Sequence, residues 1–338
     1  MVLETIWFFL WGLLWAVFFV TDGFDLGIGT IYPFLGKNDE EKRIMINSLG
    51  PLWDGNEVWL ITAGGVTFAA FPLVYSVMFS TLYTPLMLIL FALIIRGVSF
   101  EFRGLSEKKS WKGIWDTTIF AGSFLPSLLF GVAFANIFQG IPIDGKGIMH
   151  GNLFTLLNPY GIIGGLLFVS LFVVHGLLWI CIRGVGELEE RAKKIVGYAW
   201  IAELLLALGF LGASYVYTEL YDNYFKYPVL WIIPIFAAVS LLLVRVFIWK
   251  NKFFAAWGFS ASSIFFCTFF GVAGLFPNLF PSCINPEFSL TAFNASSSPL
   301  TLKIMLGVVI VFIPIVIAYQ FFAYKMFSTK VDTDDFTY

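Results

Sequence analysis

Residues 160–183 read YGIIGGLLFVSLFVVHGLLWICIR, a run without an acidic residue in which only His175 and Arg183 can carry a positive charge. A membrane-spanning helix needs about 20 mostly apolar residues, so this run is long enough to cross a bilayer. The whole chain has the same character, with 59% hydrophobic and 12% charged residues. That charged share is about half of the roughly 25% usual in soluble domains. We therefore predict an all-α integral membrane protein.

Nine such runs follow one another along the chain. They lie near residues 6–33, 52–74, 77–98, 115–138, 160–183, 197–219, 228–249, 255–276 and 302–326. The connections leave no room for a separate soluble domain, so residues 1–338 are expected to form a single polytopic membrane domain. Two four-helix bundles plus one further helix would fit nine spans. The first run is long enough to pass beyond the bilayer or to break at its polar residues around Asp22.

Basic residues predict the orientation, because cytoplasmic loops of membrane proteins are enriched in Lys and Arg. Nine spans with alternating direction place 17 of the 20 basic residues on one side and only Lys146, Lys226 and Lys303 on the other. The N-terminus is therefore expected outside and the C-terminus in the cytoplasm. Tryptophans near span ends, among them Trp7, Trp11, Trp231 and Trp249, are expected at the membrane interfaces.

Composition excludes several classes of function. The 20 basic and 22 acidic residues give no positive field for nucleic acid. High hydrophobicity excludes intrinsic disorder. Cys181, Cys267 and Cys283 are isolated in the sequence and form neither a disulfide framework nor a zinc motif. The first apolar run lacks a basic leader and a small-residue cleavage site, so it is expected to be a retained span.

Ionisable residues at membrane depth are the main functional signal, because each costs at least ~2.5–3.5 kcal/mol to insert. The first three spans carry five carboxylates, namely Asp22, Asp25, Asp54, Glu57 and Glu101. The predicted topology places all five near the inner side, together with Arg96, Asn56 and Trp59. Glu203 in the sixth span is a further candidate at similar depth.

Two interpretations of these carboxylates are open from the residues alone. Clustered carboxyl groups can pass protons or cations through bound water, which would make them an entry route from the cytoplasm. Alternatively, Arg96 and Arg103 neutralise the acids, and Asp54 and Glu57 favour the positive end of a helix dipole.

Haem and metal sites are not expected in this chain. A bis-histidine site needs two facing ligands, whereas His150 falls in an outer loop and His175 within the fifth span. A hydrogen-bonded core histidine is the expected role of His175. The cysteines have no partner at metal-ligand spacing, and no Walker motif occurs.

Several motifs resemble subunit II of the cytochrome bd-type quinol oxidases, and together they cover most of the chain. They include TDGFDLG at 21–27, RIMINS at 43–48, WDGNEVWL at 53–60, RGVSFEFR at 96–103, GSFLP at 122–126 and NASSS at 294–298. The resemblance implies a pseudo-symmetric complex with a homologous subunit I, which would bind two haems b, one haem d and the quinol. Such a complex oxidises quinol and reduces dioxygen to water with protons from the cytoplasm.

By the same resemblance, Asp54 and Glu101 match the acidic motif of a proton path, with Arg96 and Trp59 nearby. Further expected partners are membrane lipid, quinone and, in some family members, a small single-span accessory subunit. The implied location is a bacterial or archaeal cytoplasmic membrane. Two rival functions are a secondary transporter with its own substrate site and a scaffold that only stabilises subunit I. The choice between ubiquinone and menaquinone lies with subunit I.

Overall fold

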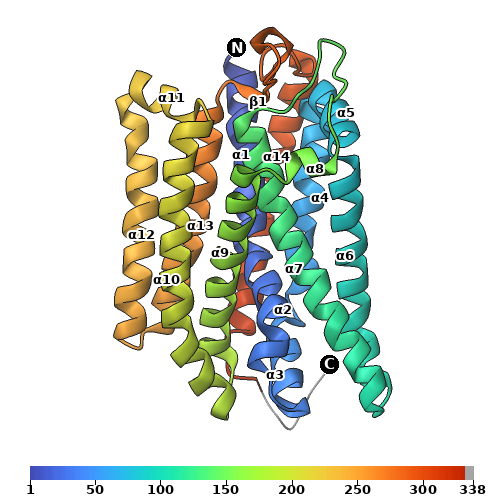
Figure 1. Ribbon diagram of the computed structural model, residues 1–338, viewed down its shortest axis with the longest axis vertical. Coiled ribbons are helices and arrows are strands. Elements are labelled where there is room, and N and C mark those ends of the chain that lie inside the picture. The colour runs from blue at the N-terminus through green and yellow to red at the C-terminus, as the bar shows by residue number, and fades with distance from the viewer. Residues whose placement is uncertain (332–338) are drawn as a thin grey trace.

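The computed structural model describes residues 1–331 and consists mainly of long helices that run side by side (Figure 1). The long helices are α1 (Val2–Thr21), α2 (Gly23–Leu35), α4 (Trp53–Ala70), α6 (Tyr83–Phe102), α7 (Lys109–Gln139), α9 (Pro159–Arg183), α10 (Gly186–Tyr217), α12 (Ile232–Trp249), α13 (Phe253–Leu275) and α14 (Pro299–Met326). Shorter helices are α3 (Asp39–Leu49), α5 (Pro72–Thr81), α8 (Leu153–Leu156) and α11 (Leu220–Lys226). The predicted all-α membrane fold is confirmed.

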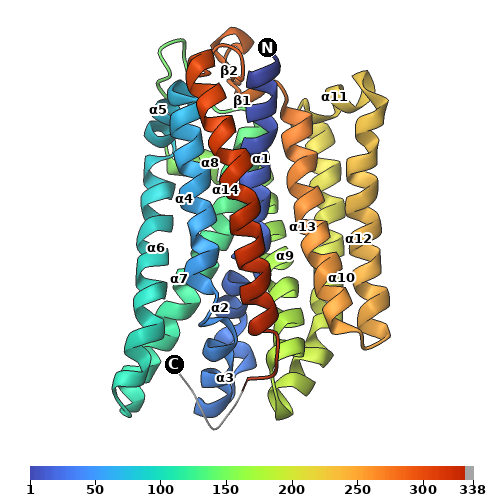
Figure 2. The same cartoon turned by 180° about the vertical axis from the view of Figure 1, so that it is seen from behind.

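The long helices form two groups, which meet where α9 packs against α2 and α7 and where α13 packs against α1. One group contains α1 with its continuation α2, together with α4, α6 and α7, and the other contains α9, α10, α12 and α13. Helix α9 packs against α2 and α7 of the first group as well as α10 and α13 of its own. Helix α14 lies over α1 and α4 on the outside of the first group (Figure 2). This arrangement matches the expected pair of bundles with one further helix.

Eight helical segments of the described chain are long and apolar enough to cross a membrane. The expected span 52–74 corresponds to α4. This helix is not among the eight, because Asp54, Asn56 and Glu57 make its first turns polar. The nine-span count and the orientation therefore stay predictions. We call the end of the molecule that carries α3 the inner end, following the predicted orientation, and the opposite end the outer end.

The predicted bounds of the second and third spans were wrong. Helix α4 ends at Ala70, and the separate short helix α5 occupies Pro72–Thr81, so the third span begins at Tyr83 rather than at residue 77. Pro72 is the first residue of α5. A proline has no N–H to donate and clashes with the preceding turn, so it is favoured at the first position of a helix, where neither property costs a hydrogen bond.

The two longest loops fold together at the outer end. Strands β1 (Asn278–Phe280) and β2 (Leu290–Thr291) form an antiparallel pair, and Ile141 of the other loop makes a bridge to Ser282. The backbone N–H of Ser297 donates to the carbonyl of Ala70. These contacts make a cap over the outer ends of α1, α4 and α7.

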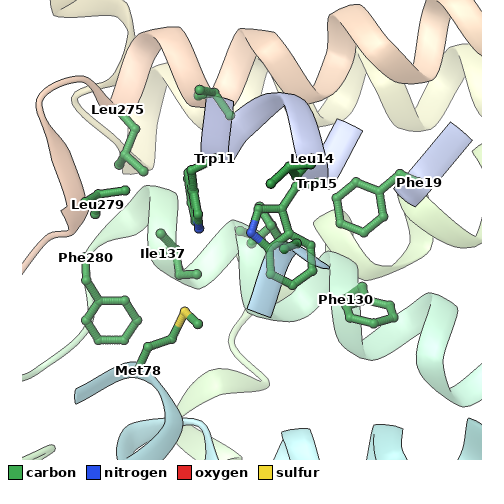
Figure 3. Packing of buried hydrophobic residues seen from close by; sticks show 14 of the residues in the cluster. Trp11, Leu14, Trp15, Phe19, Met78, Phe130, Ile137, Leu275, Leu279 and Phe280 are labelled. Atoms are coloured by element: carbon green, nitrogen blue, oxygen red, sulfur yellow. The ribbon is translucent and has the colours of Figure 1, made fainter. Parts of the chain in front are cut away.

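Aromatic side chains of α1 fill the centre of the first group (Figure 3). Trp15 packs against Phe134 with ring centroids 5.2 Å apart. The expectation that Trp7 and Trp11 anchor the chain by facing lipid was wrong, because both are 1% exposed. Their indole N–H groups donate to the carbonyl of Leu302 and the hydroxyl of Thr67, which satisfies the buried donors.

Ion pairs join the elements at the inner end. Arg103 donates to Asp116 at 2.6 Å and to Asp39 at 2.8 Å, and Lys42 reaches the same Asp116. This finding corrects one alternative from the sequence, in which Arg103 neutralises the membrane carboxylates. Nearby, hydrogen bonds from the Arg191 guanidinium lower the pKa of Glu41 on α3 below its usual range.

Candidate functional site

Carboxylates from three elements surround one arginine inside the first group. Arg96 of α6 donates to Asp22 at 3.1 Å, and both side chains are fully buried. Glu57 of α4 lies 3.6 Å from the same nitrogen and is 23% exposed. Asn56 of α4 donates to Asp25 of α2 at 2.7 Å. We call these five residues the acid–arginine cluster.

The backbone between α1 and α2 places both aspartates in the cluster. Asp22 lies between the end of α1 and the start of α2. Its N–H donates to the carbonyl of Phe18 and its carbonyl accepts from the N–H of Leu26, so the chain continues in nearly the same direction. The predicted break around Asp22 is therefore a local junction rather than a change of path. A Cβ at Gly27 would overlap the backbone carbonyl of Phe172, so the glycine allows α2 to lie directly against α9.

The cluster contains more acid than base. Three carboxyl groups share one guanidinium, and among residues 1–331 no hydrogen-bond partner reaches Asp22 Oδ2, Asp25 Oδ1 or Arg96 Nε and Nη1. A buried polar atom without a partner costs free energy unless water or a proton compensates it. The geometry therefore favours carboxyl groups that exchange protons or bind water.

The last long helix completes the cluster, which the sequence did not reveal. The hydroxyl of Tyr324 on α14 donates to Asn56 Oδ1 at 2.8 Å, so a chain of hydrogen bonds runs from Tyr324 through Asn56 to Asp25. Gln320, one turn earlier, accepts from the indole N–H of Trp59 at 3.0 Å. No charge or motif in this part of the sequence indicates such a role.

An apolar cavity of about 660 Å³ adjoins this end of the cluster. It lies between α1, α4, α14 and the inner halves of α9 and α13. Trp59, Tyr324 and Gln320 line it together with Trp179 and Trp257. The cavity has room for an apolar chain, and Tyr324, which bonds to Asn56 of the cluster, is among its few polar groups.

The structure does not bring Asp54 and Glu101 into the cluster. Both side chains are exposed, Asp54 in the first turn of α4 and Glu101 in the last turn of α6. Asp54 accepts from the N–H of Gly55 and lies close enough to Glu57 to influence its charge. The five predicted carboxylates thus divide into two buried, one half-buried and two exposed groups.

The histidines do not form a haem-ligand pair. His175 is buried, stacks on Trp257 with ring centroids 5.1 Å apart, and shares a hydrogen bond with Ser260. This environment agrees with the expected hydrogen-bonded core histidine. His150 lies in the outer loop against Asp144 at 3.0 Å. Hydrogen bonds from the backbone of Ile148 and from His150 lower the pKa of Asp144 to about 2.

Comparisons with known proteins agree on one family. The family model described as cytochrome bd terminal oxidase subunit II matches residues 3–327. Cytochrome bd-I ubiquinol oxidase subunit 2 of Escherichia coli is 39% identical over 98% of this chain and 97% of its own length. Cytochrome bd ubiquinol oxidase subunit 2 of Bacillus subtilis is 35% identical over 97% of both chains. A chain of the bd oxidase structure from Geobacillus thermodenitrificans shares the fold, with a TM-score of 0.77 and 17% identity over 97% of this chain and 99% of that chain.

Proposed function

Because this chain belongs to the cytochrome bd terminal oxidase subunit II family, we propose that it pairs with a haem-bearing subunit I and supplies part of the proton route of the complex. The chain is a subunit of a bd-type terminal oxidase and a multi-pass membrane protein. In our proposal the two haems b, the haem d and the quinol-oxidising site belong to subunit I. The separate places of the two histidines support this division, because His175 stacks on Trp257 inside the helices and His150 bonds to Asp144 in the outer loop.

The acid–arginine cluster is the observation that carries the proton route. Exposure decreases from Asp54 through the half-buried Glu57 to the buried Asp22 and Asp25. Reduction of dioxygen consumes protons, which must cross from the cytoplasm into the membrane. In the proposed route Asp54 and Glu101 collect protons at the inner surface, and Glu57, Asp22 and Asp25 carry them inward through bound water.

Arg96 and Asn56 have supporting roles in this proposal. Arg96 stabilises a negative charge on Asp22 or Glu57 after a proton has left, because opposite charges at this distance favour the ionised form. Asn56 fixes Asp25 and is itself fixed by Tyr324. Trp59 closes the side of the route that faces α14.

The cavity and the membrane around the cluster also have a role in this proposal. The cavity beside Trp59 and Tyr324 would accept the apolar tail of a lipid or a quinone. In this proposal the complex resides in a bacterial or archaeal cytoplasmic membrane and includes a small single-span accessory subunit.

Asp25→Asn and Asp54→Asn test the proton route, because an amide keeps the size and hydrogen bonding of the acid but does not titrate. We expect each variant complex to assemble with its haems and to consume oxygen more slowly per haem d in reconstituted vesicles. The reduction rate of the haems by quinol should stay normal. Asp116→Asn is a matched control, because Asp116 is bonded to Arg103 and Lys42 outside the cluster.

The results for these variants distinguish a proton route through the cluster from a structural role of its carboxyl groups. Normal turnover per haem d in Asp25→Asn would contradict a proton route through the cluster. A parallel loss of haem content, stability and activity would instead indicate a scaffold, in which the acids only neutralise Arg96. A transporter would require a substrate-dependent flux without a haem-bearing partner.

A further inference from the structure

A second buried carboxyl group lies in the other helix group. Glu203 of α10 is 1% exposed, and among residues 1–331 no hydrogen-bond partner reaches either of its carboxyl oxygens. Ser263 of α13 is also buried, and its hydroxyl lacks a partner within the same residues. The proposed proton route uses neither residue. Helices α10, α12 and α13 lie together in both views of the molecule (Figures 1 and 2).

Leu204 and Ile264, the residues directly after Glu203 and Ser263, line an apolar cavity of about 270 Å³ that extends toward the outer end. Ala207, four residues after Glu203, lines it from α10, and Cys267, four residues after Ser263, lines it from α13. Residues four apart share a helix face, so Glu203 and Ser263 lie at the inner end of this cavity. An apolar cavity of ~150 Å³ in another protein takes up benzene, so this space can admit a lipid-soluble molecule of similar or larger size.

The surroundings of Glu203 favour the neutral acid. An ionised carboxylate in an apolar interior needs a cation or several donors, and without them it takes up a proton instead. Arg245, the nearby cation on α12, lies over the ring of Trp200 at 5.8 Å. On α9, His175 is engaged with Ser260. On α13, the thiol of Cys267 lies close enough to interact with Glu203, and it is not a cation.

We propose that Glu203 is a proton-holding carboxylic acid, separate from the acid–arginine cluster, which lipid-soluble carboxyl reagents reach through the 270 Å³ cavity. The proposal does not depend on the proton route. It assigns a modification site for hydrophobic carbodiimides. In that reaction the carboxyl oxygen bonds to the central carbon of the reagent while the acid proton moves to one nitrogen. The acyl group then migrates to a nitrogen and forms a stable N-acylurea.

The test uses the purified complex, dicyclohexylcarbodiimide and a water-soluble carbodiimide, each at neutral pH, with the modified peptides identified by mass spectrometry. We expect dicyclohexylcarbodiimide to modify Glu203 and the water-soluble reagent to leave it unmodified. Glu189 near the start of the same helix is the internal control, because it is partly exposed and paired with Lys193 and Lys330. It should react with the water-soluble reagent only.

Two variants make the test specific. Glu203→Gln should lose the modified peptide, and Ala207→Leu, which fills the cavity and leaves the acid in place, should reduce its yield several-fold. Infrared spectra of the wild-type complex should contain a carbonyl band of a neutral acid that Glu203→Gln lacks. Absence of this band, or reaction of Glu203 with the water-soluble reagent as fast as Glu189, would overturn the proposal. So would an unmodified Glu203 in the wild-type complex after treatment with dicyclohexylcarbodiimide.

Discussion

The pair formed by Asp22 and Arg96 allows the cluster to be tested quantitatively. Both side chains are fully buried, and their closest atoms are 3.1 Å apart. Coulomb's law at an effective dielectric constant of ~20 gives an attraction of ~5 kcal/mol at this distance. Removal of one partner from a buried pair typically costs ~3–5 kcal/mol, because the other charge stays uncompensated. We therefore expect Arg96→Gln to lower the free energy of unfolding by about 4 kcal/mol.

The effect of Asp22→Asn on stability should depend on whether residue 96 is Arg or Gln. Alone, it removes one charged hydrogen bond but leaves Arg96 with Glu57, so we expect a loss of about 1.5 kcal/mol. Combined with Arg96→Gln, it removes the unpaired carboxylate and should restore part of the lost stability. A double variant that loses about 3 kcal/mol in total would give a coupling energy of about 2.5 kcal/mol, within the range for contacting residues.

The measurement is unfolding of the purified complex in mixed detergent micelles, followed by tryptophan fluorescence. Arg245→Gln provides the matched control, because Arg245 is an exposed arginine on a spanning helix and lies over the face of Trp200. Its loss should stay below about 1 kcal/mol. An Arg96→Gln loss as small as that of the control, or an additive double variant, would refute the pairing that we derive from the geometry.

Three further predictions follow from single contacts. Tyr324→Phe removes the hydroxyl that donates to Asn56, and in the same unfolding assay it should cost about 1 kcal/mol; an unchanged value would show that α14 does not fix the cluster. Gly27→Ala forces a methyl group against α9 and should cost about 1–3 kcal/mol, whereas Gly64→Ala on the open face of α4 should cost nothing. The lowered pKa of Glu41 means that its contribution to stability is present above its ordinary pKa and is lost as the pH falls through the lower value in the folded state. Glu41→Gln should therefore flatten the acid limb of the stability–pH curve, and an unchanged limb would contradict this assignment.

Most of the fold was predictable because the bilayer imposes a simple rule on sequence. A spanning helix must be apolar along its length, so eight of the nine expected spans appear directly as long apolar helices. The same rule fails at α4, since Asn56 and Glu57 in its first turns contact Asp25 and Arg96 rather than lipid. It also fails at Trp7 and Trp11, because composition does not distinguish an indole at the interface from an indole bonded to a neighbouring helix.

The site was only partly predictable because it depends on contacts between distant parts of the chain. The motifs around Asp22, Asn56 and Arg96 contained enough polar residues at one depth to indicate a cluster. Tyr324 joins this cluster from α14, 268 residues away from Asn56. The residues before it, Phe321, Phe322 and Ala323, are apolar, and Lys325 after it indicates only the basic end of a span. Only the packing of α14 over α1 and α4 therefore identifies it.

The direction in which each carboxylate faces follows from helix geometry once one neighbour is placed. Successive residues of an α-helix are rotated by about 100°, so Asp54 faces about 200° away from Asn56, and Glu101 about 140° away from Arg96. Because Arg96 faces the cluster, Glu101 faces outward, whereas Asp54, about 60° from the half-buried Glu57, lies at the edge of the cluster, and both residues are exposed. Both lie in terminal turns, where a charge can reach the polar membrane surface or a partner subunit at little cost. We infer that these two residues mark where a proton route begins, and that its buried part starts at Glu57.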